Sequence, residues 1–278
     1  MECAPVKRSI LDIANIGASI RVTQGRALKT HRLHIEEPTL VAVWRGQKCL
    51  RWAGRELIVH TGEVVALASE QTFDVINIPC STTGTFEADA LVCADQVVES
   101  FLTCRPKGRR IQDVQLIQPA CDGLLNSFRH AYTSFYAKDQ LPEAVIRSRL
   151  EEMLTWLDHH GGYFGSSTSN QVTLRVRQLI SSNPGKMWTA PMVARQLAMS
   201  EATFRRRLGA ENNHFQQLLF DVRMTRALTL LQVTDLSVAS IAYEVGYSCS
   251  SRFSFRFRQR FGRSPSDIRL SDAVEHLI

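Results

Sequence analysis

The sequence predicts an α+β protein, with an N-terminal antiparallel β-barrel carrying helices and a C-terminal all-α domain of two helix-turn-helix units joined by a linker helix. Three observations support this class. Short β-branched runs alternate with evenly spaced glycines, a Gly/Ser/Thr-rich stretch interrupts the chain past its middle, and a capped helix-turn-helix pattern then occurs twice. With 278 residues, 44% of them hydrophobic, the chain can form a core for each domain.

The N-terminal domain is expected over residues 1–160. Gly46, Gly54 and Gly62 recur every eight residues between the runs LVAVW, CLRW, ELIVH and EVVALA, which is typical of short strands joined by turns. Residues 20–95 therefore predict a small cupin-like antiparallel barrel or jelly roll, whose interior is a candidate ligand site. Helices are expected from about residue 95 to 160.

The clearest of these helices is expected from Pro142 to His160, where two glycines end it. A stripe of apolar side chains runs along it: Val145, Leu150, Met153, Leu154 and Leu157. Such a stripe indicates either a homodimer through the helix 142–160 or packing on its own barrel. The stretch GGYFGSSTSNQ at 161–171 is then a linker, which places the second domain at 172–270.

The positive charge belongs to the C-terminal part. Residues 1–170 hold 18 Lys and Arg against 19 Asp and Glu, whereas residues 171–278 hold 15 against 8. Only Lys186 among those 15 cations is a lysine, and arginine is the side chain that forks onto phosphate oxygens and guanine edges. The pattern favours a polyanion partner, with a generic solvated basic face as the alternative.

The first helix-turn-helix unit is expected at about residues 189–210. Thr189 and Ser200 are placed to cap its two short helices, and the residues just before Ser200 form the tight break between them. Near the end at which a recognition helix meets bases, the outward face of the second helix carries Glu201, Ala202, Thr203, Arg205 and Arg206.

The second unit is expected at about residues 237–261, with Ser237 as the cap and Gly246 at the break. Three phenylalanines of its second helix fall at i, i+4 and i+8 and are expected to be core rather than base-stacking side chains: Phe253, Phe257 and Phe261. The opposite face of that helix carries Ser250, Ser251, Ser254, Phe255 and Arg258.

Between the two units, residues 214–232 predict one amphipathic helix. At 1.5 Å per residue it spans roughly 28 Å, close to the ~34 Å between successive major-groove faces. One chain is therefore expected to place both recognition helices on one side of the duplex and to read two adjacent half-sites.

The C-terminal residues resemble the signature of the AraC/XylS regulators over about residues 172–270. The linker-helix sequence QLLFDVRMTRALTLL also resembles that of the acid-resistance and virulence-gene activators of that family. The matching positions are Val238, Ile241, Ala242, Gly246, Tyr247, Ser251, Phe253, Phe257, Arg258, Phe261, Gly262, Ser264, Pro265, Ser266 and Arg269.

The resemblance implies seven helices and base contacts from both units. In the first unit they fall on Ala202, Arg205 and Arg206, and in the second on Ser250, Ser251, Ser254 and Phe255. Two departures are visible: Arg252 stands where the family usually has an aromatic, and Phe255 stands where a polar residue is common. Phe255 is expected to contact a thymine methyl or to pack on a neighbouring helix. Phosphate contacts are expected from Arg258 and Arg263.

The resemblance also implies that the barrel binds a small effector or a protein partner. Lys29, His31, Trp44 and Trp52 gather polar and aromatic chemistry on the early strands, and relatives of similar size bind fatty acids in such a pocket; ordinary barrel core is the alternative. No metal or other cofactor is expected. The sequence has no HxH pair, and His31 and His34 would point to opposite faces of a regular strand.

The combined expectation is a transcription activator of a virulence or stress response that binds double-stranded promoter DNA and RNA polymerase, and not an enzyme. Two alternatives stay open: an architectural DNA binder without sequence preference, and an enzyme fused to a DNA-binding module, although the cysteine clusters of alkylation-repair proteins are missing. Without an apolar stretch of about 20 residues or a signal peptide, the protein is expected in the cytoplasm and not in a membrane. The seven cysteines, with no CxxC pair, predict buried reduced thiols.

Overall fold

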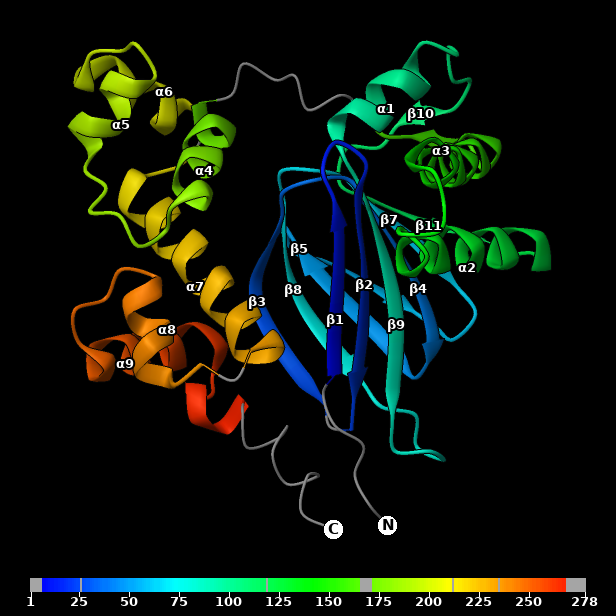
Figure 1. Ribbon diagram of the computed structural model, residues 1–278, viewed down its shortest axis with the longest axis horizontal. Helices are drawn as coiled ribbons and strands as arrows, with labels where there is room; N and C mark the ends of the chain where they lie inside the picture. The colour runs from blue at the N-terminus through cyan, green and yellow to red at the C-terminus, as the bar shows by residue number, and fades with distance from the viewer. Residues whose placement is uncertain are drawn as a thin grey trace. The chain divides into compact units, whose positions relative to one another are not determined.

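The computed structural model describes residues 7–25, 27–118, 120–165, 172–211, 213–234 and 236–268 (Figure 1). Contacts divide the chain near residue 167 into two compact units. The N-terminal unit contains all the strands and three helices, and the C-terminal unit is helical. The predicted α+β class is confirmed.

Two antiparallel sheets form the N-terminal unit. The larger has the order β1-β2-β9-β4-β7-β11, and the smaller has the order β3-β8-β5-β6. The strands of the larger sheet are β1 Lys7–Ile13, β2 Gly17–Gln24, β9 Phe86–Cys93, β4 Thr39–Arg45, β7 Val64–Leu67 and β11 Val114–Ile117. Those of the smaller sheet are β3 Leu28–Ile35, β8 Gln71–Ile78, β5 Gln47–Trp52 and β6 Arg55–Val59.

The two sheets share one apolar core. Val41 and Val43 of β4 pack in the same buried cluster as Leu50 and Phe73 of the smaller sheet. These strands are hydrogen-bonded within two separate sheets, so the predicted closed barrel is not formed in the described residues. Two sheets that face each other across one core are nearer to the jelly roll that the sequence left as the alternative.

The larger sheet is also covered on its other face by helices, as Figure 1 shows. These are α1 Asp95–Leu102, α2 Asp122–Tyr136 and α3 Glu143–His159. Leu40 and Ala42 of β4 face these helices, while the valines that alternate with them face the smaller sheet. Burial on both faces is the reason that the run LVAV is continuously apolar.

The apolar stripe of α3 packs inside its own unit. Leu150, Met153, Leu154 and Leu157 are at most 1% exposed and belong to the core that contains α2 and the larger sheet. The stripe is therefore not available to a second copy. Val145, which the sequence predicts to belong to this stripe, is instead 37% exposed, and Ile146 is buried in its place. A dimer through the helix 142–160 would have to use the exposed side of α3.

The first residues of the predicted linker 161–171 are part of the N-terminal unit. Gly162–Tyr163 form a strand, β12, that pairs in parallel with β10, Arg109–Arg110, and so belong to the N-terminal unit. Residues 166–171 of that prediction lie outside the described residues.

The cysteines are more exposed than the sequence predicts. Cys49 and Cys93 are buried, but Cys104, Cys121 and Cys249 are exposed. Cys121 has a local structural role, because its Sγ accepts a hydrogen bond from the amide of Leu124 at the start of α2.

Among the described residues of the C-terminal unit, a short helical segment at residues 265–268 follows six longer helices. The longer helices are α4 Val172–Ser182, α5 Ala190–Gln196, α6 Glu201–Ala210, α7 Phe215–Val233, α8 Val238–Glu244 and α9 Ser250–Phe261. Helices α4, α5 and α6 share an apolar core with the first half of α7. In the part of the chain that the structure describes, no helix has the length and hydrophobicity needed to span a bilayer.

Candidate nucleic-acid interface

The first helix-turn-helix unit consists of α5 and α6, with the boundaries set by local signals. Thr189 Oγ1 accepts a hydrogen bond from the amide of Met192, and Ser200 Oγ accepts one from Thr203 at 3.2 Å. Ala198 takes a left-handed backbone conformation (φ 55°) in the turn between the helices. Phe204 anchors α6 in the core, which turns the opposite side of the helix toward solvent.

That solvent-facing side carries the predicted contact residues. Ala202, Arg205 and Arg206 are exposed, and Thr203 is half-buried. The hydroxyl of Thr203 lies 2.9 Å from that of Ser200, so it belongs to the cap of α6 as well as to the face.

The two arginines differ in their surroundings. Arg205 donates from Nε (2.9 Å) and Nη2 (2.6 Å) to Glu201 Oε1, one turn back along α6. Such a pair contributes only about 0.3–0.5 kcal/mol, and Arg205 is 68% exposed, so DNA can displace Glu201. No hydrogen bond or ion pair holds the Arg206 side chain among the described residues.

The second unit consists of α8 and α9. Ser237 Oγ accepts a hydrogen bond from the amide of Ser240 at 3.0 Å, and Gly246 (φ 82°) makes the turn. The phenylalanines of α9 are core, as predicted: Phe253 and Phe257 are 0% exposed and Phe261 is 6% exposed.

The outward face of α9 is chemically different from that of α6. Ser251, Phe255 and Arg258 are exposed, while Ser250 and Ser254 are half-buried. Phe255 is 66% exposed, so it does not pack on a neighbouring helix, and contact with DNA remains the prediction for it. Arg252 is exposed and Arg263 is half-buried.

Two of the C-terminal arginines do not face solvent, although the charge count included them. Arg260 of α9 and Asp221 of α7 form an ion pair (Nη2 to Oδ1, 3.4 Å) in which each side chain is 4% exposed. Gln217 Nε2 donates to the same Asp221 oxygen at 3.0 Å. Arg177 of α4 is only 5% exposed. The DNA-facing charge is therefore smaller than the sequence indicates.

The predicted effector residues are not brought to one site. Trp44 lies on the larger sheet beside the helices, while Trp52 lies on the smaller sheet, where it packs on Phe73 and donates to Asp113 at 2.8 Å. Lys29 is exposed on β3, and the side chain of His31 lies outside the described part.

The argument from strand alternation about His31 and His34 does not hold, because β3 is irregular between Thr30 and Leu33. Its pairing with β8 shifts register there, which breaks the strict two-residue period. His34 is buried, and its Nε2 lies 3.6 Å from Glu70 Oε1.

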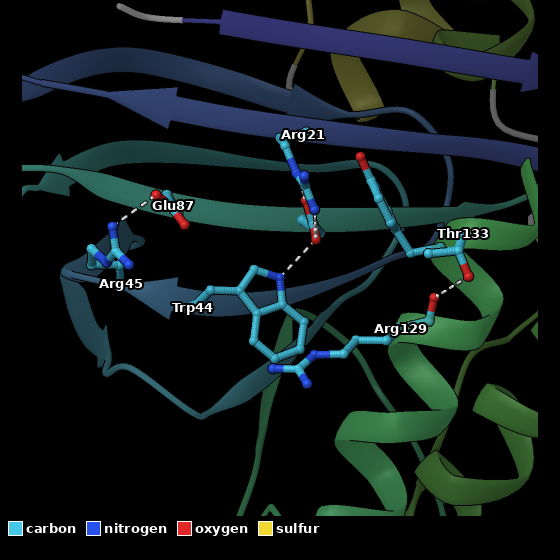
Figure 2. Close-up of a pocket in the computed structure, with 8 residues that line it drawn as sticks. Arg21, Trp44, Arg45, Glu87, Arg129 and Thr133 are labelled. Atoms are coloured by element: carbon cyan, nitrogen blue, oxygen red, sulfur yellow. Dashed lines mark hydrogen bonds and ion pairs between the residues drawn. The ribbon is translucent and has the colours of Figure 1, made fainter. Parts of the chain in front are cut away.

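Trp44 lines a groove of about 430 Å³ between the larger sheet and α2, shown in Figure 2. Asp89 at its base is 2% exposed and accepts from Trp44 Nε1 (2.7 Å) and from Arg21 Nε (2.8 Å) and Nη2 (2.9 Å). That carboxylate raises the pKa of Arg21 and fixes the tryptophan. The Arg129 guanidinium lies 4.7 Å from the Trp44 ring centroid, with no ion pair to a carboxylate among the described residues.

Comparison with known families agrees with the two-unit geometry. Residues 193–271 match a family model described as a helix-turn-helix domain, and similar curated proteins include transcriptional regulators. The C-terminal unit is an AraC/XylS-type DNA-binding domain. The family prediction from the C-terminal signature is confirmed.

Three of the similar curated proteins, all from Escherichia coli, show the extent of the match. The dual transcriptional regulator Rns is 27% identical over 165 residues, 58% of each chain. The urease operon transcriptional activator is 36% identical over 34% of this chain and 32% of its own. The regulator GadX is 33% identical over 36% of this chain and 37% of its own. The chain thus spans less than two thirds of the length of these relatives.

Solved structures extend the similarity of fold to both units. An apo variant of ToxT from Vibrio cholerae superposes with a TM-score of 0.72 at 13% identity, covering 96% of this chain and 97% of that one. Wild-type ToxT with a bound unsaturated fatty acid gives 0.69 at 14% identity, covering 99% of each chain. This likeness shows the fold.

Proposed function

We propose that this protein is a sequence-specific DNA-binding transcription regulator and an activator, in which residues 172–270 read promoter DNA and residues 1–160 respond to an effector. The observation that carries the proposal is the exposed arginine face of α6, on a capped helix anchored by Phe204. Arginine in the major groove pairs with guanine O6 and N7, which gives base preference as well as affinity. Such a regulator acts in the cytoplasm and recruits RNA polymerase.

The proposal includes two adjacent half-sites read by one chain. Helix α7 has 19 residues and spans about 28 Å, near one turn of the duplex. Contacts to bases come from Ala202, Thr203, Arg205, Arg206, Ser250, Ser251, Ser254 and Phe255, and contacts to phosphates from Arg258 and Arg263.

The ratio of specific to non-specific binding tests this function. DNA fragments selected by the protein from a random pool are compared with scrambled fragments of the same length, at one fixed salt concentration. A regulator binds its selected site at least about a thousandfold more tightly. Equal affinity for both fragments indicates an architectural binder and contradicts the proposal.

For the N-terminal unit, we propose a small anionic effector, of which a fatty acid is the first to test because similarly folded ToxT has been solved with one bound. The groove beside Trp44 supports this proposal, since Arg129 offers a fork for a carboxylate there.

Tryptophan fluorescence tests the effector site. Titration with palmitoleate is expected to change the emission of the wild-type protein and to alter its affinity for the selected site. Arg129→Met is expected to lose the response, while Arg147→Met, a half-buried α3 residue outside the groove, retains it. No response from the wild type, or an equal response from Arg129→Met, contradicts the assignment.

A further inference from the structure

Helix α7 is one connection between the two helix-turn-helix units, and the structure contains a second one. The loop between α4 and α5 leads into the first unit and packs Trp188 in its core, and the turn after α8 belongs to the second unit. Both contact the side chain of Arg223, near the middle of α7.

Arg223 binds the first of these segments with two hydrogen bonds. Its Nε donates to the carbonyl of Pro184 and its Nη2 to the carbonyl of Lys186, each at 3.0 Å. Two parallel donors on one planar group fix both the position and the direction of the loop.

Contacts within the loop keep it rigid. A shift of Arg223 would therefore move the whole loop instead of deforming it. Trp188 Nε1 donates to the carbonyl of Asn183 at 2.8 Å, and the Lys186 ammonium lies 4.4 Å from the Trp188 ring centroid. The amide of Lys186 donates to Asn183 Oδ1 at 3.1 Å.

The same guanidinium contacts the second unit. It lies 6.0 Å from the ring centroid of Tyr247. A Cβ at Gly246 would lie 2.4 Å from Arg223 Nη2, and one at Gly185 would lie 2.8 Å from the carbonyl oxygen of Glu244. Two glycines, one in each unit, therefore allow the segments to meet at this arginine.

The Arg223 guanidinium is half-buried, and this burial lowers its pKa. A half-buried cation in this position needs its carbonyl partners, so the arrangement is kept in one geometry.

We propose that Arg223 is a positioning residue that fixes the two recognition helices, α6 and α9, relative to each other, and so sets which spacing of half-sites the protein accepts. Held by α7 alone, the two units keep the freedom of one helix to bend and of each unit to shift on it. The second connection removes that freedom. The proposal rests on the DNA-binding function proposed above.

The test measures binding by the full chain to its selected site and to versions with one base pair inserted or removed between the half-sites. Each added base pair rotates the second half-site about one tenth of a turn away from its helix. The wild type is expected to lose at least about tenfold in affinity on either change. Arg223→Met is expected to bind the original site more weakly and to discriminate among the three spacings by less than about threefold.

Three further variants keep the test decisive. Arg226→Met, an exposed arginine one turn along α7, is the matched control and is expected to keep the wild-type ratio among spacings even if its affinity falls. Arg223→Lys lacks the two-donor guanidinium, and Gly185→Ala pushes the two segments apart. Both are expected to lose spacing preference, and they replace Arg223→Met in the test if that variant does not fold.

The outcomes separate this inference from the function on which it rests. A wild type without preference for the selected site overturns the DNA-reading function itself. In the other case the wild type is sequence-specific, while the folded variants Arg223→Met, Arg223→Lys and Gly185→Ala keep its ratio of affinities among the three spacings. That result overturns the role of Arg223 alone.

Discussion

The two helix-turn-helix units share a plan and differ in what their second helices present. Helix α6 exposes Arg205 and Arg206 on its outward face, whereas α9 exposes Ser251, Phe255 and Arg258 there and uses Arg260 in its core. A guanidinium in solvent can read a base edge, but one that is paired with a buried carboxylate cannot. The difference teaches that the number of arginines in a unit does not measure its capacity to read DNA.

The largest expected effect concerns the core of the second unit. Asp221→Ala leaves Arg260 buried without its carboxylate and is expected to destabilise the C-terminal unit by about 3–5 kcal/mol. Urea unfolding followed by far-UV circular dichroism measures the loss as an earlier transition of the helical unit.

Replacing both partners distinguishes the loss of the ion pair from the cost of leaving one charge buried without its partner. The double variant Asp221→Ala/Arg260→Met is expected to recover part of the stability, because no uncompensated charge remains. A single variant as stable as the wild type would show that the pair does not hold α9 on α7.

Base reading by the first unit gives the next effect. Arg206→Ala is expected to weaken binding to the selected site by about 1–3 kcal/mol and to relax the preference at one base pair. Ser251→Ala, an exposed position of α9, is the matched variant and is expected to change base preference less. Gel shifts on site variants measure both, and a larger effect of the serine would reverse the comparison.

Phosphate anchoring by the second unit predicts a different signature. Arg258→Ala and Arg263→Ala are each expected to weaken binding to all sequences alike, and to reduce the slope of log affinity against log salt by about 1. Titrations from low to high salt check this prediction. A preserved slope, or a loss confined to certain sequences, would assign these residues another role.

The smallest effect comes from the exposed ion pair of α6. Glu201→Gln frees Arg205 and removes a negative charge beside the phosphates, at a cost of about 0.3–0.5 kcal/mol to the helix. We therefore expect slightly tighter DNA binding and nearly unchanged stability. Weaker binding of this variant would mean that Glu201 itself contacts the DNA, for example at a cytosine amino group.

Local signals let the sequence predict most of the C-terminal unit. Thr189, Ser200 and Ser237 are caps in the structure because a side-chain oxygen and an amide three residues later depend on local geometry only. The spacing of the α9 phenylalanines likewise identified the core face.

Non-local contacts could not be predicted in the same way. The burial of Arg260 depends on Asp221, 39 positions away in the sequence, and periodicity alone treats an arginine as exposed. The stripe of α3 indicated an apolar partner without showing that the partner is its own unit. The meeting of two loops at Arg223 depends on how both units pack on α7.

The most direct test is selection of binding sites from random DNA by the wild type, by Arg206→Ala and by Ser251→Ala. The wild type is predicted to select two half-sites about one helical turn apart, one of them with stronger base preference. Arg206→Ala is predicted to lose that stronger preference, and Ser251→Ala to keep it. Two half-sites of equal preference in the wild type, or a stronger half-site that survives Arg206→Ala unchanged, would contradict the unequal roles of the two units.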